Sequence, residues 1–479
     1  MTIHRRTLLR NGLLYSSAAA FLPPARIIPW RWFGLDPLPN PDQSGIEHIV
    51  VLTMENRSFD HFFGWFPNAD GKQAGLIFVD AKNVAHSTYS LSGDNTGCPH
   101  PDPDHSYSGA RVEYDLGKMD GFLRAGSNDV FSIGYYGEQD IPFLANLARS
   151  YTTCDRYFVS ILGPTFPNRL FLHAAQTDRL TDSIAFTSLP TIWDRLAAAG
   201  VSGRYYFNNV PVLALWGTKY LDITRTFDDF KSDAANGTLP AVAYLDPRFT
   251  TIDDGLGTDD HPHADIRRGD RFLHDAFEAV ANGPDWSSTV FIITFDEWGG
   301  FFEHVPPPRA TAANNVDTDL VDGKALLGFR VPTIIASPFT RGVENNPQVN
   351  HLVFDHTSIL KLIEWRWSLA PLTPRDASTD IGNLAYALNF NQPVVSVPTL
   401  PKPYVPFFPE PCFQTLFGGI FGSESARAAA TEPSPSRTEG SNATTNSPAT
   451  STPIELWNQL GQRAMEQGFP VQNPTLDEP

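Results

Sequence analysis

Cysteine is scarce in this chain of 479 residues: Cys98, Cys154 and Cys412 are its only three, and no two of them have CxxC spacing. A disulfide framework and a zinc knuckle are therefore not indicated, although one pair can be oxidised outside the cytoplasm. Basic residues are also few, since 35 Lys and Arg stand against 53 Asp and Glu and leave a formal charge of −18. Without a basic block to follow phosphates, the chain is not expected to bind DNA or RNA.

The chain also lacks any segment of eighteen uninterrupted apolar residues, so we expect at most peripheral contact with a membrane. Its start, "MTIHRRTLLRNGLLYSSAAAFLPPAR", has adjacent Arg5 and Arg6, a short apolar stretch from Leu13 to Leu22, and then prolines. This order resembles a twin-arginine export signal. The alternative is a disordered basic terminus. We predict an export signal and linker over residues 1–44, and a location in the periplasm, at the cell envelope or outside the cell.

Short apolar runs alternate with helix-like stretches between residues 45 and 409. The runs "HIVVLTM", "SGRYYF", "AVAYLD", "TVFIITFD" and "VPTIIASPF" are typical of strands that are buried on both faces of a parallel sheet. Between them, residues 189–200 and 267–283 have helical spacing and end on glycine. This alternation predicts one α/β catalytic domain, a three-layer α/β/α sandwich with a mostly parallel central sheet. Chemistry in such sheets gathers beyond the carboxyl ends of the strands.

The composition changes after the predicted domain. Residues 423–453 are rich in Ser, Thr, Pro and Ala and offer almost nothing to bury. We therefore predict that residues 410–479 form a mostly disordered tail. The closing "IELWNQLGQRAMEQGF" can form a short amphipathic helix, which we expect to dock back onto the domain rather than to bind a partner.

The segment "TMENRSFDHFFG", residues 53–64, combines acids, an amide and a histidine with three phenylalanines. If the preceding "IEHIVVL" is a strand, Glu55 and Asn56 lie at its carboxyl end, where oxygen ligands can meet a divalent cation. The alternative is a capped loop in which Asp60 begins a helix. Carboxylates at strand ends are common, so this segment does not decide between the two readings by itself.

A second segment, "ILGPTFPNR", holds Thr165 between two prolines on a stiff turn, with Asn168 and Arg169 directly after it. A hydroxyl close to a metal and a guanidinium is suited to phosphoryl transfer, because the metal lowers the pKa of the alkoxide and the guanidinium balances charge on the phosphate. The alternative for Thr165 is a helix cap, which is the usual role of threonine at a turn.

A third segment, "FIITFDEWGGFFEHVPPP", places Asp296 and Glu297 at the end of a predicted strand, and His304 follows in the next loop. Adjacent carboxylates repel each other unless a cation lies beside them, so a divalent metal ion is the economical explanation. The two glycines permit close approach of another backbone. A turn that begins with Asp and carries a surface Glu would explain neither the glycines nor the histidine.

Further histidines can serve as metal ligands or as general acids. "GTDDHPHADIRRGD" contains His261 and His263, "PDPDHSY" contains His105, and His356 stands at the predicted start of a helix. The alternative for any one of them is a solvated loop side chain.

Together these segments resemble the bacterial phosphoesterase family that holds phosphatidylcholine-hydrolysing phospholipases C and certain acid phosphatases. The matching pieces occur in the family's order over residues 46–367: "MENRSFDHFFG", "DPDHSY", "GPTFPNR", "DDHPH", "FDEWGGFFEHVPPP", "GFRVPTIIASPF" and "DHTSILKLIEW". The resemblance implies an alkaline-phosphatase-like fold. It also implies a metal cluster that includes Glu55, Asn56, Asp296 and Glu297, a nucleophile at Thr165, and phosphate-facing residues at His105, His261 and His304. Asn168 and Arg169 belong to the same catalytic set, and His263 and His356 are further candidates.

Three hypotheses follow from these residues and from the resemblance. The leading one is an exported phospholipase C that uses a divalent metal ion and a phosphothreonine intermediate. The second is a broad acid phosphatase with the same site and a phosphomonoester substrate. The third is a catalytically silent binding protein, which should lack one or more of the site acids, yet all of them are present. No protein partner is evident. The threonine at position 165 and the aromatic residues favour a lipid substrate with a choline head group.

Overall fold

The computed structural model describes residues 35, 37–249, 255–342, 347–407, 412 and 453–471. The predicted export signal lies outside the described residues, as does most of the predicted tail. The terminal helix is described, as α11 (Pro453–Glu466). No helix within the described ranges is both long enough and apolar enough to cross a membrane.

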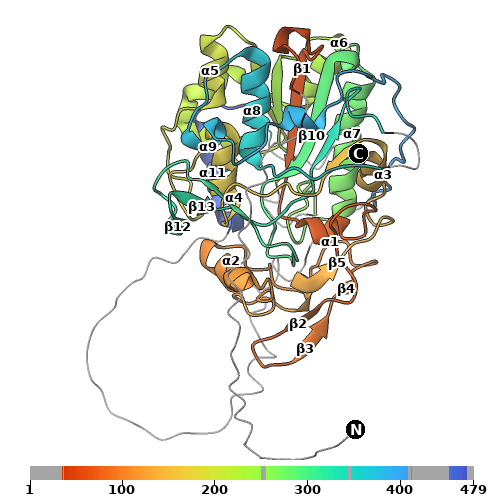
Figure 1. Cartoon of the computed structure of the whole chain (residues 1–479), viewed down its shortest axis with the longest axis vertical. Helices are drawn as coiled ribbons and strands as arrows, with labels where there is room; N and C mark the ends of the chain where they lie inside the picture. Colours follow the sequence, from red (N-terminus) through yellow and green to blue (C-terminus); the bar gives the residue numbers. More distant parts are fainter. Residues whose placement is uncertain are drawn as a thin grey trace, which may run out of the picture. The chain divides into compact units, whose positions relative to one another are not determined.

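The centre of the fold is an eight-stranded sheet in the order β15-β6-β14-β10-β1-β9-β7-β8 (Figure 1). Its strands are β1 (His48–Met54), β6 (Thr152–Cys154), β7 (Gly203–Phe207), β8 (Thr224–Thr226), β9 (Val242–Leu245), β10 (Thr289–Phe295), β14 (Ile334–Ala336) and β15 (Gln348–Asn350). Five neighbouring pairs are parallel, whereas β14 is antiparallel to both β10 and β6. The predicted mostly parallel sheet is confirmed, and the strand in "VPTIIASPF" is its antiparallel member.

Helices cover both faces of this sheet (Figure 1). One layer contains α4 (Thr165–Ala174), α5 (Ile192–Ala198), α8 (His356–Trp367) and α9 (Pro374–Ala377), and the other contains α3 (Pro142–Ser150), α6 (Phe227–Asn236) and α7 (Ile266–Ala281). The two helices predicted from apolar spacing are α5 and α7. The three-layer α/β/α architecture is therefore confirmed.

Shorter elements make up the loops around these layers. They are α1 (Phe59–Phe63), α2 (Tyr107–Tyr114), β2 (Ile77–Val79), β3 (Ala85–Ser87), β4 (Tyr89–Ser90), β5 (Gly134–Tyr135), β11 (Arg309–Thr311), β12 (Leu320–Val321) and β13 (Lys324–Leu326). The 3-10 helices are η1 (Pro41–Gln43), η2 (Asp115–Gly117), η3 (Val130–Ile133), η4 (Val212–Ile223), η5 (Trp286–Ser288) and η6 (Leu384–Ala387).

The core lies between the sheet and its helices. Every residue of β10 is buried, and so are six of the seven residues of β1. On α7 the buried side chains recur every three or four residues, as in Leu273, Phe277 and Val280, so a single apolar stripe faces the sheet. The two central strands are therefore held rigidly, so the residues that directly follow them have fixed positions.

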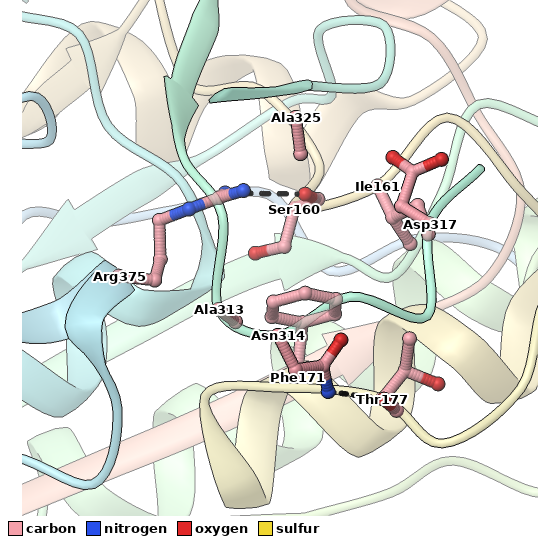
Figure 2. A pocket seen from close by; sticks show the side chains of 9 residues that line it. All are labelled: Ser160, Ile161, Phe171, Thr177, Ala313, Asn314, Asp317, Ala325 and Arg375. Atoms are coloured by element: carbon pink, nitrogen blue, oxygen red, sulfur yellow. Dashed lines mark hydrogen bonds between the residues drawn. The ribbon is translucent and has the colours of Figure 1, made fainter. Parts of the chain in front are cut away.

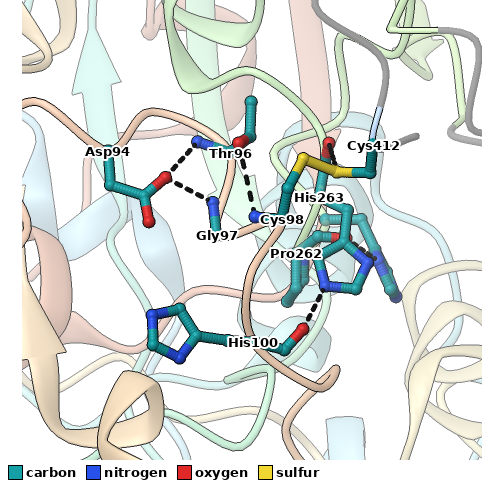
Figure 3. Close-up of a disulfide and its surroundings, with 9 residues drawn as sticks. Asp94, Thr96, Gly97, Cys98, His100, Pro262, His263 and Cys412 are labelled. Carbon is teal, nitrogen blue, oxygen red and sulfur yellow. Dashed lines mark hydrogen bonds between the residues drawn. A yellow bond between two sulfur atoms is a disulfide. The ribbon is translucent and has the colours of Figure 1, made fainter. Parts of the chain in front are cut away.

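Two of the three cysteines are joined in a disulfide between Cys98 and Cys412, with their Cα atoms 5.2 Å apart (Figure 3). The bond connects a loop of the domain to a residue 314 positions further along the chain. Cys154 is a free, buried thiol at the end of β6. The pair left open by the sequence is thus Cys98 with Cys412.

Candidate active site

Three neighbouring parallel strands end at the same edge of the sheet. β1 lies between β10 and β9, with Met54 opposite Phe295 and Leu52 opposite Leu245. The residues that follow these strands are Glu55, Asp296 and Asp246, all of them buried. The strand register therefore brings three carboxylates together, although their positions in the sequence are far apart.

The turn after β1 depends on a glycine of the turn after β10. Asn56 adopts a left-handed backbone conformation with φ of 60°, and its N–H donates to Oδ1 of Asp296 at 3.4 Å. A Cβ atom on Gly299 would lie 2.1 Å from the carbonyl oxygen of Asn56, and Gly299 itself has φ of 67°. Both its conformation and this close approach require glycine. The predicted role of the glycines in "DEWGG" is confirmed at Gly299.

Thr165 is the first residue of α4 and follows Pro164. Its side-chain hydroxyl donates to Oδ1 of Asn56 at 3.4 Å, across 109 positions of sequence. The first turn of α4 therefore places the Thr165 hydroxyl beside the turn that also carries Glu55. Thr165 is only 4% exposed, so the hydroxyl has a fixed place in the site.

Asn168 holds the turn that presents Thr165. Its side-chain amide donates to the carbonyls of Gly163 at 2.8 Å and of Ile161 at 3.2 Å, and its Oδ1 accepts from the N–H of Ile161 at 3.2 Å. The amide is thus fully engaged with backbone groups. Asn168, predicted to be catalytic, is a positioning residue in this structure.

Arg169 lies among the carboxylates at the strand ends. Its guanidinium contacts Asp246 at 2.9 Å, Asp296 at 3.0 Å and Glu55 at 3.3 Å, and the side chain is buried. The sequence predicted that this cation would face a phosphate. The structure instead directs it at three acids, so its charge stabilises the carboxylate cluster.

His105 and His261 lie next to this cluster. Nε2 of His105 is 3.9 Å from Oε1 of Glu297, and the two imidazole rings are 5.7 Å apart. Each ring donates its Nδ1–H to a proline carbonyl, Pro103 at 2.8 Å for His105 and Pro262 at 3.0 Å for His261. In that tautomer Nε2 of each ring is available to bind a metal or to transfer a proton. Asp102 completes a group of three possible ligands with the two histidines.

The carboxylates of the site carry more negative charge than the protein neutralises. Burial, followed by the charge of Asp296, raises the pKa of Glu55 well above its ordinary value. Burial also raises the pKa of Asp296 to about 6 although Arg169 opposes the shift, and the pKa of Glu297 is raised well above its ordinary value, chiefly by burial. Burial lowers the pKa of His105, but Glu297 and Asp102 outweigh it and raise that pKa to about 10.

Some oxygens of these carboxylates lack hydrogen-bond donors. Both carboxylate oxygens of Glu55 and Oε1 of Glu297 are buried without a hydrogen-bond partner. Buried acceptors are nearly always satisfied in proteins, and oxygen-rich sets of this kind are satisfied by hard cations. The unpaired oxygens of Glu55 and Glu297 therefore fit a divalent ion. Asn56, Thr165 and Asp296 stay predicted ligands, and among the described residues the group of possible ligands that lie close together beside Thr165 is Asp102, His105 and His261.

His304 belongs to a different group of side chains. Its Nδ1 lies 2.5 Å from Oδ2 of Asp60 and its Nε2 lies 3.2 Å from Oδ1 of Asp70, while Arg330 pairs with Glu303 at 2.6 Å in the same group. These contacts join α1 to the loop that follows β10. The structure does not bring His304 to Thr165, and so does not support its predicted place facing the phosphate.

The other two candidate histidines support the site from outside. Nε2 of His356 donates to the backbone carbonyl of Asp296 at 2.8 Å, and burial lowers the pKa of His356 to about 4, so the ring is neutral. His263 has a left-handed backbone conformation and donates from Nε2 to the carbonyl of His100 at 3.0 Å, close to the disulfide (Figure 3). His356 therefore positions the turn that carries Asp296, whereas His263 contacts the loop of the disulfide.

Sequence reasoning missed Asp246 and Asp102. Asp246 is the last residue of the predicted strand "AVAYLD", so the rule that singled out Glu55 and Asp296 was sufficient to find it. Asp102 lies in an irregular loop, where only the tertiary fold shows that it reaches the two histidines.

A separate small pocket lies beside α4 (Figure 2). Arg375 donates to the carbonyl of Ser160 there at 3.2 Å, and the Asn314 amide donates to the carbonyl of Thr177 at 2.8 Å. These hydrogen bonds hold backbone segments in place. None of the candidate catalytic residues lines this cavity.

Comparison with known proteins identifies the family. The model of the Phosphoesterase family matches residues 46–370. Non-specific phospholipase C6 of Arabidopsis thaliana is 31% identical over 368 residues, which cover 70% of this chain and 71% of that protein. Phospholipase C B of Mycobacterium tuberculosis is 32% identical over 485 aligned positions, which cover 85% and 89%.

Among solved structures, that of a protein in the alkaline phosphatase superfamily from Vibrio parahaemolyticus matches with a TM-score of 0.37 and 10% identity, over 73% of this chain and 72% of the other. The family match covers well over half of the chain and contains every residue of the site described above. This chain therefore belongs to the Phosphoesterase family and is a hydrolase that acts on phosphoester bonds.

Proposed function

We propose that the protein is an exported, metal-dependent phosphoesterase of the phospholipase C type, which hydrolyses phosphatidylcholine-like phosphodiesters through a phosphothreonine intermediate. One observation carries the proposal: the Thr165 hydroxyl contacts Asn56, whose backbone N–H contacts Asp296, within a buried cluster of acids. The relatives named phospholipases C support the substrate class.

Each step uses side chains placed by the fold. The Thr165 hydroxyl gives up its proton to solvent as Oγ forms a bond to phosphorus and the bond from phosphorus to the leaving alcohol oxygen breaks. His261 lines the same pocket as Thr165, and we assign it the transfer of a proton to the leaving oxygen. Water then attacks phosphorus and gives up a proton to the same histidine, while the bond from phosphorus to Oγ of Thr165 breaks and Oγ takes back a proton from solvent.

Glu55, Asn56, Asp296 and Glu297 would hold the cation together with Oγ of Thr165. When bound, a divalent ion supplies positive charge that stabilises the threonine alkoxide and the phosphoryl oxygens. Arg169 and the carbonyl-bound His356 keep these ligands in place. The residues of the chain thus supply the nucleophile, the proton carrier and the cation ligands.

The charge of the site favours a diester over a monoester. A phosphomonoester carries one more negative charge than a choline diester and needs additional cations close to the phosphate. Arg169, however, is already paired with three carboxylates. Among the described residues, the cation that remains beside the site is His105, whose pKa is raised to about 10 by Glu297 and Asp102. The single charge of a diester is easier to balance there than the two charges of a monoester.

Two features support export. The first is the resemblance of residues 1–26 to a twin-arginine signal. The second is the disulfide between Cys98 and Cys412, because disulfides persist in oxidising compartments outside the cytoplasm.

Chelation of the cation should remove activity. We expect EDTA followed by gel filtration to lower kcat on p-nitrophenyl phosphorylcholine by at least about tenfold, because both the alkoxide and the phosphoryl oxygens lose their counter-charge. Elemental analysis before and after treatment identifies the ion, and its return should restore the rate. Full activity in protein shown to be free of divalent metal would contradict the assigned cation site.

A comparison of two soluble substrates separates the diesterase from the phosphatase. We expect kcat/KM for p-nitrophenyl phosphorylcholine to exceed that for p-nitrophenyl phosphate by about tenfold or more, because Arg169 is paired with carboxylates and does not balance the second charge of the monoester. The two substrates share one leaving group, so the comparison isolates the phosphate charge and the choline group. A reversed preference would replace the proposal with the acid phosphatase.

A further inference from the structure

The C-terminal helix α11 is part of the folded domain. Its inward face carries Trp457, Leu460 and Ala464, all buried, and Phe469 is buried just beyond its end. It packs on η4 and lies near α4 (Figure 1). Arg463 donates to the backbone carbonyl of Ile184 and lies over the ring of a neighbouring phenylalanine. These contacts fix the helix at one place on the domain.

The start of α11 reaches the site. The indole of Trp457 stacks on Phe249, with ring centroids 4.0 Å apart and planes 11° apart, and it meets Phe166 edge to face at 4.9 Å. Phe166 directly follows Thr165, and Phe249 lies 4.7 Å from the guanidinium of Arg169. Trp457 is therefore packed against two residues that contact or adjoin the catalytic cluster.

The docked helix leaves little space above the nucleophile. The space above the nucleophile is a small pocket with room for about one water molecule, and it is lined by Thr165, Phe166, Asp182, His261, Leu456 and Trp457. A diacyl phospholipid is far larger than this space. Thr165 and His261 are 4% and 7% exposed. A phospholipid cannot place its phosphate on Thr165 while Leu456 and Trp457 occupy these positions.

We propose that Leu456 and Trp457 of α11 determine which phosphoesters reach Thr165. With α11 docked, the small pocket above Thr165 favours phosphoesters with compact substituents over diacyl substrates. A diacyl substrate requires the start of α11 to move aside. At a lipid surface the apolar side chains of α11 meet an apolar environment, so displacement is less costly there than in water. This inference rests on the proposed function, since it concerns the substrates of that site.

The first test removes the indole. Trp457→Ala is compared with wild type and with Gln459→Ala, which changes an exposed residue of the same helix. The readout is the ratio of kcat/KM for phosphatidylcholine in mixed micelles to kcat/KM for p-nitrophenyl phosphorylcholine. We expect Trp457→Ala to raise this ratio by about tenfold or more, and Gln459→Ala to leave it unchanged. An unchanged or lower ratio in a folded Trp457→Ala protein would overturn the inference.

The second test holds α11 in place and does not depend on the alanine variant folding. A Cβ atom on Gly461 would lie 3.3 Å from Cγ2 of Val210, which suits a disulfide in the double variant Val210→Cys, Gly461→Cys. Once oxidised, this variant should lose about tenfold in the lipid-to-soluble ratio and should recover it on reduction. Wild type receives the same reductant as the control, since it carries the Cys98–Cys412 bond. An oxidised variant with the wild-type ratio would overturn the inference.

The two tests separate this inference from the proposed function. If wild type hydrolyses neither substrate, the proposed function fails and the inference falls with it. If wild type hydrolyses phosphoesters but neither variant alters the ratio, only the inference about α11 fails.

Discussion

Thr165→Ala should lower kcat on p-nitrophenyl phosphorylcholine by about four to six orders of magnitude, as loss of a covalent nucleophile does in other hydrolases. The hydroxyl is held at the start of α4 and contacts Asn56 at 3.4 Å. A side chain that only capped the helix would not produce such a loss. Thermal unfolding should change little, because the hydroxyl makes one long hydrogen bond.

A matched variant and a chemical readout make this result decisive. Thr165→Ser keeps the hydroxyl and should retain activity within about two orders of magnitude of wild type. Acid quenching during turnover, followed by peptide mass analysis, should find a phosphorylcholine group on the peptide that holds Thr165. A folded Thr165→Ala protein with wild-type kcat would reject the covalent mechanism, whatever else the site does.

The elements that the sequence predicted well are those whose local pattern matches the fold. β1 and β10 are continuous apolar runs because both of their faces are buried. Their carboxyl ends therefore coincide, and Glu55 and Asp296 could be placed together from sequence alone. β6 and β15 have three residues each, too few to give a period, and they were not found.

The resemblance implied a phosphate-facing His304, which the structure places in another group of side chains. His304 follows Glu297 by seven positions, yet the loop turns through Gly299 and Gly300, both at positive φ, and carries the imidazole to Asp60. The sequence did not predict where on the domain α11 docks either. Its apolar spacing shows that one face must be buried, but only the fold shows that this face lies beside Thr165.

Arg169→Ala should be the most damaging change to stability in the site. The guanidinium is buried and contacts Glu55, Asp246 and Asp296. Its removal leaves three buried carboxylates without a counter-charge, and breaking such an interaction typically costs about 3–5 kcal/mol of the free energy of unfolding. Chemical denaturation of the metal-free variant and of metal-free wild type measures this difference directly. Arg169→Lys keeps the charge but not the fork of donors, so we expect an intermediate loss.

The response of Arg169→Ala to divalent ions is a second test of the charge balance at these carboxylates. If the acids that Arg169 neutralises also bind a cation, addition of Ca²⁺, Mn²⁺ or Zn²⁺ should stabilise Arg169→Ala more than it stabilises wild type, because the ion replaces part of the missing charge. Tm with and without each ion measures the effect. Suppose instead that Arg169→Ala unfolds like wild type and loses only activity. The guanidinium would then act on the substrate phosphate, as its position after Thr165 first suggested, and the carboxylates would need another source of stabilisation.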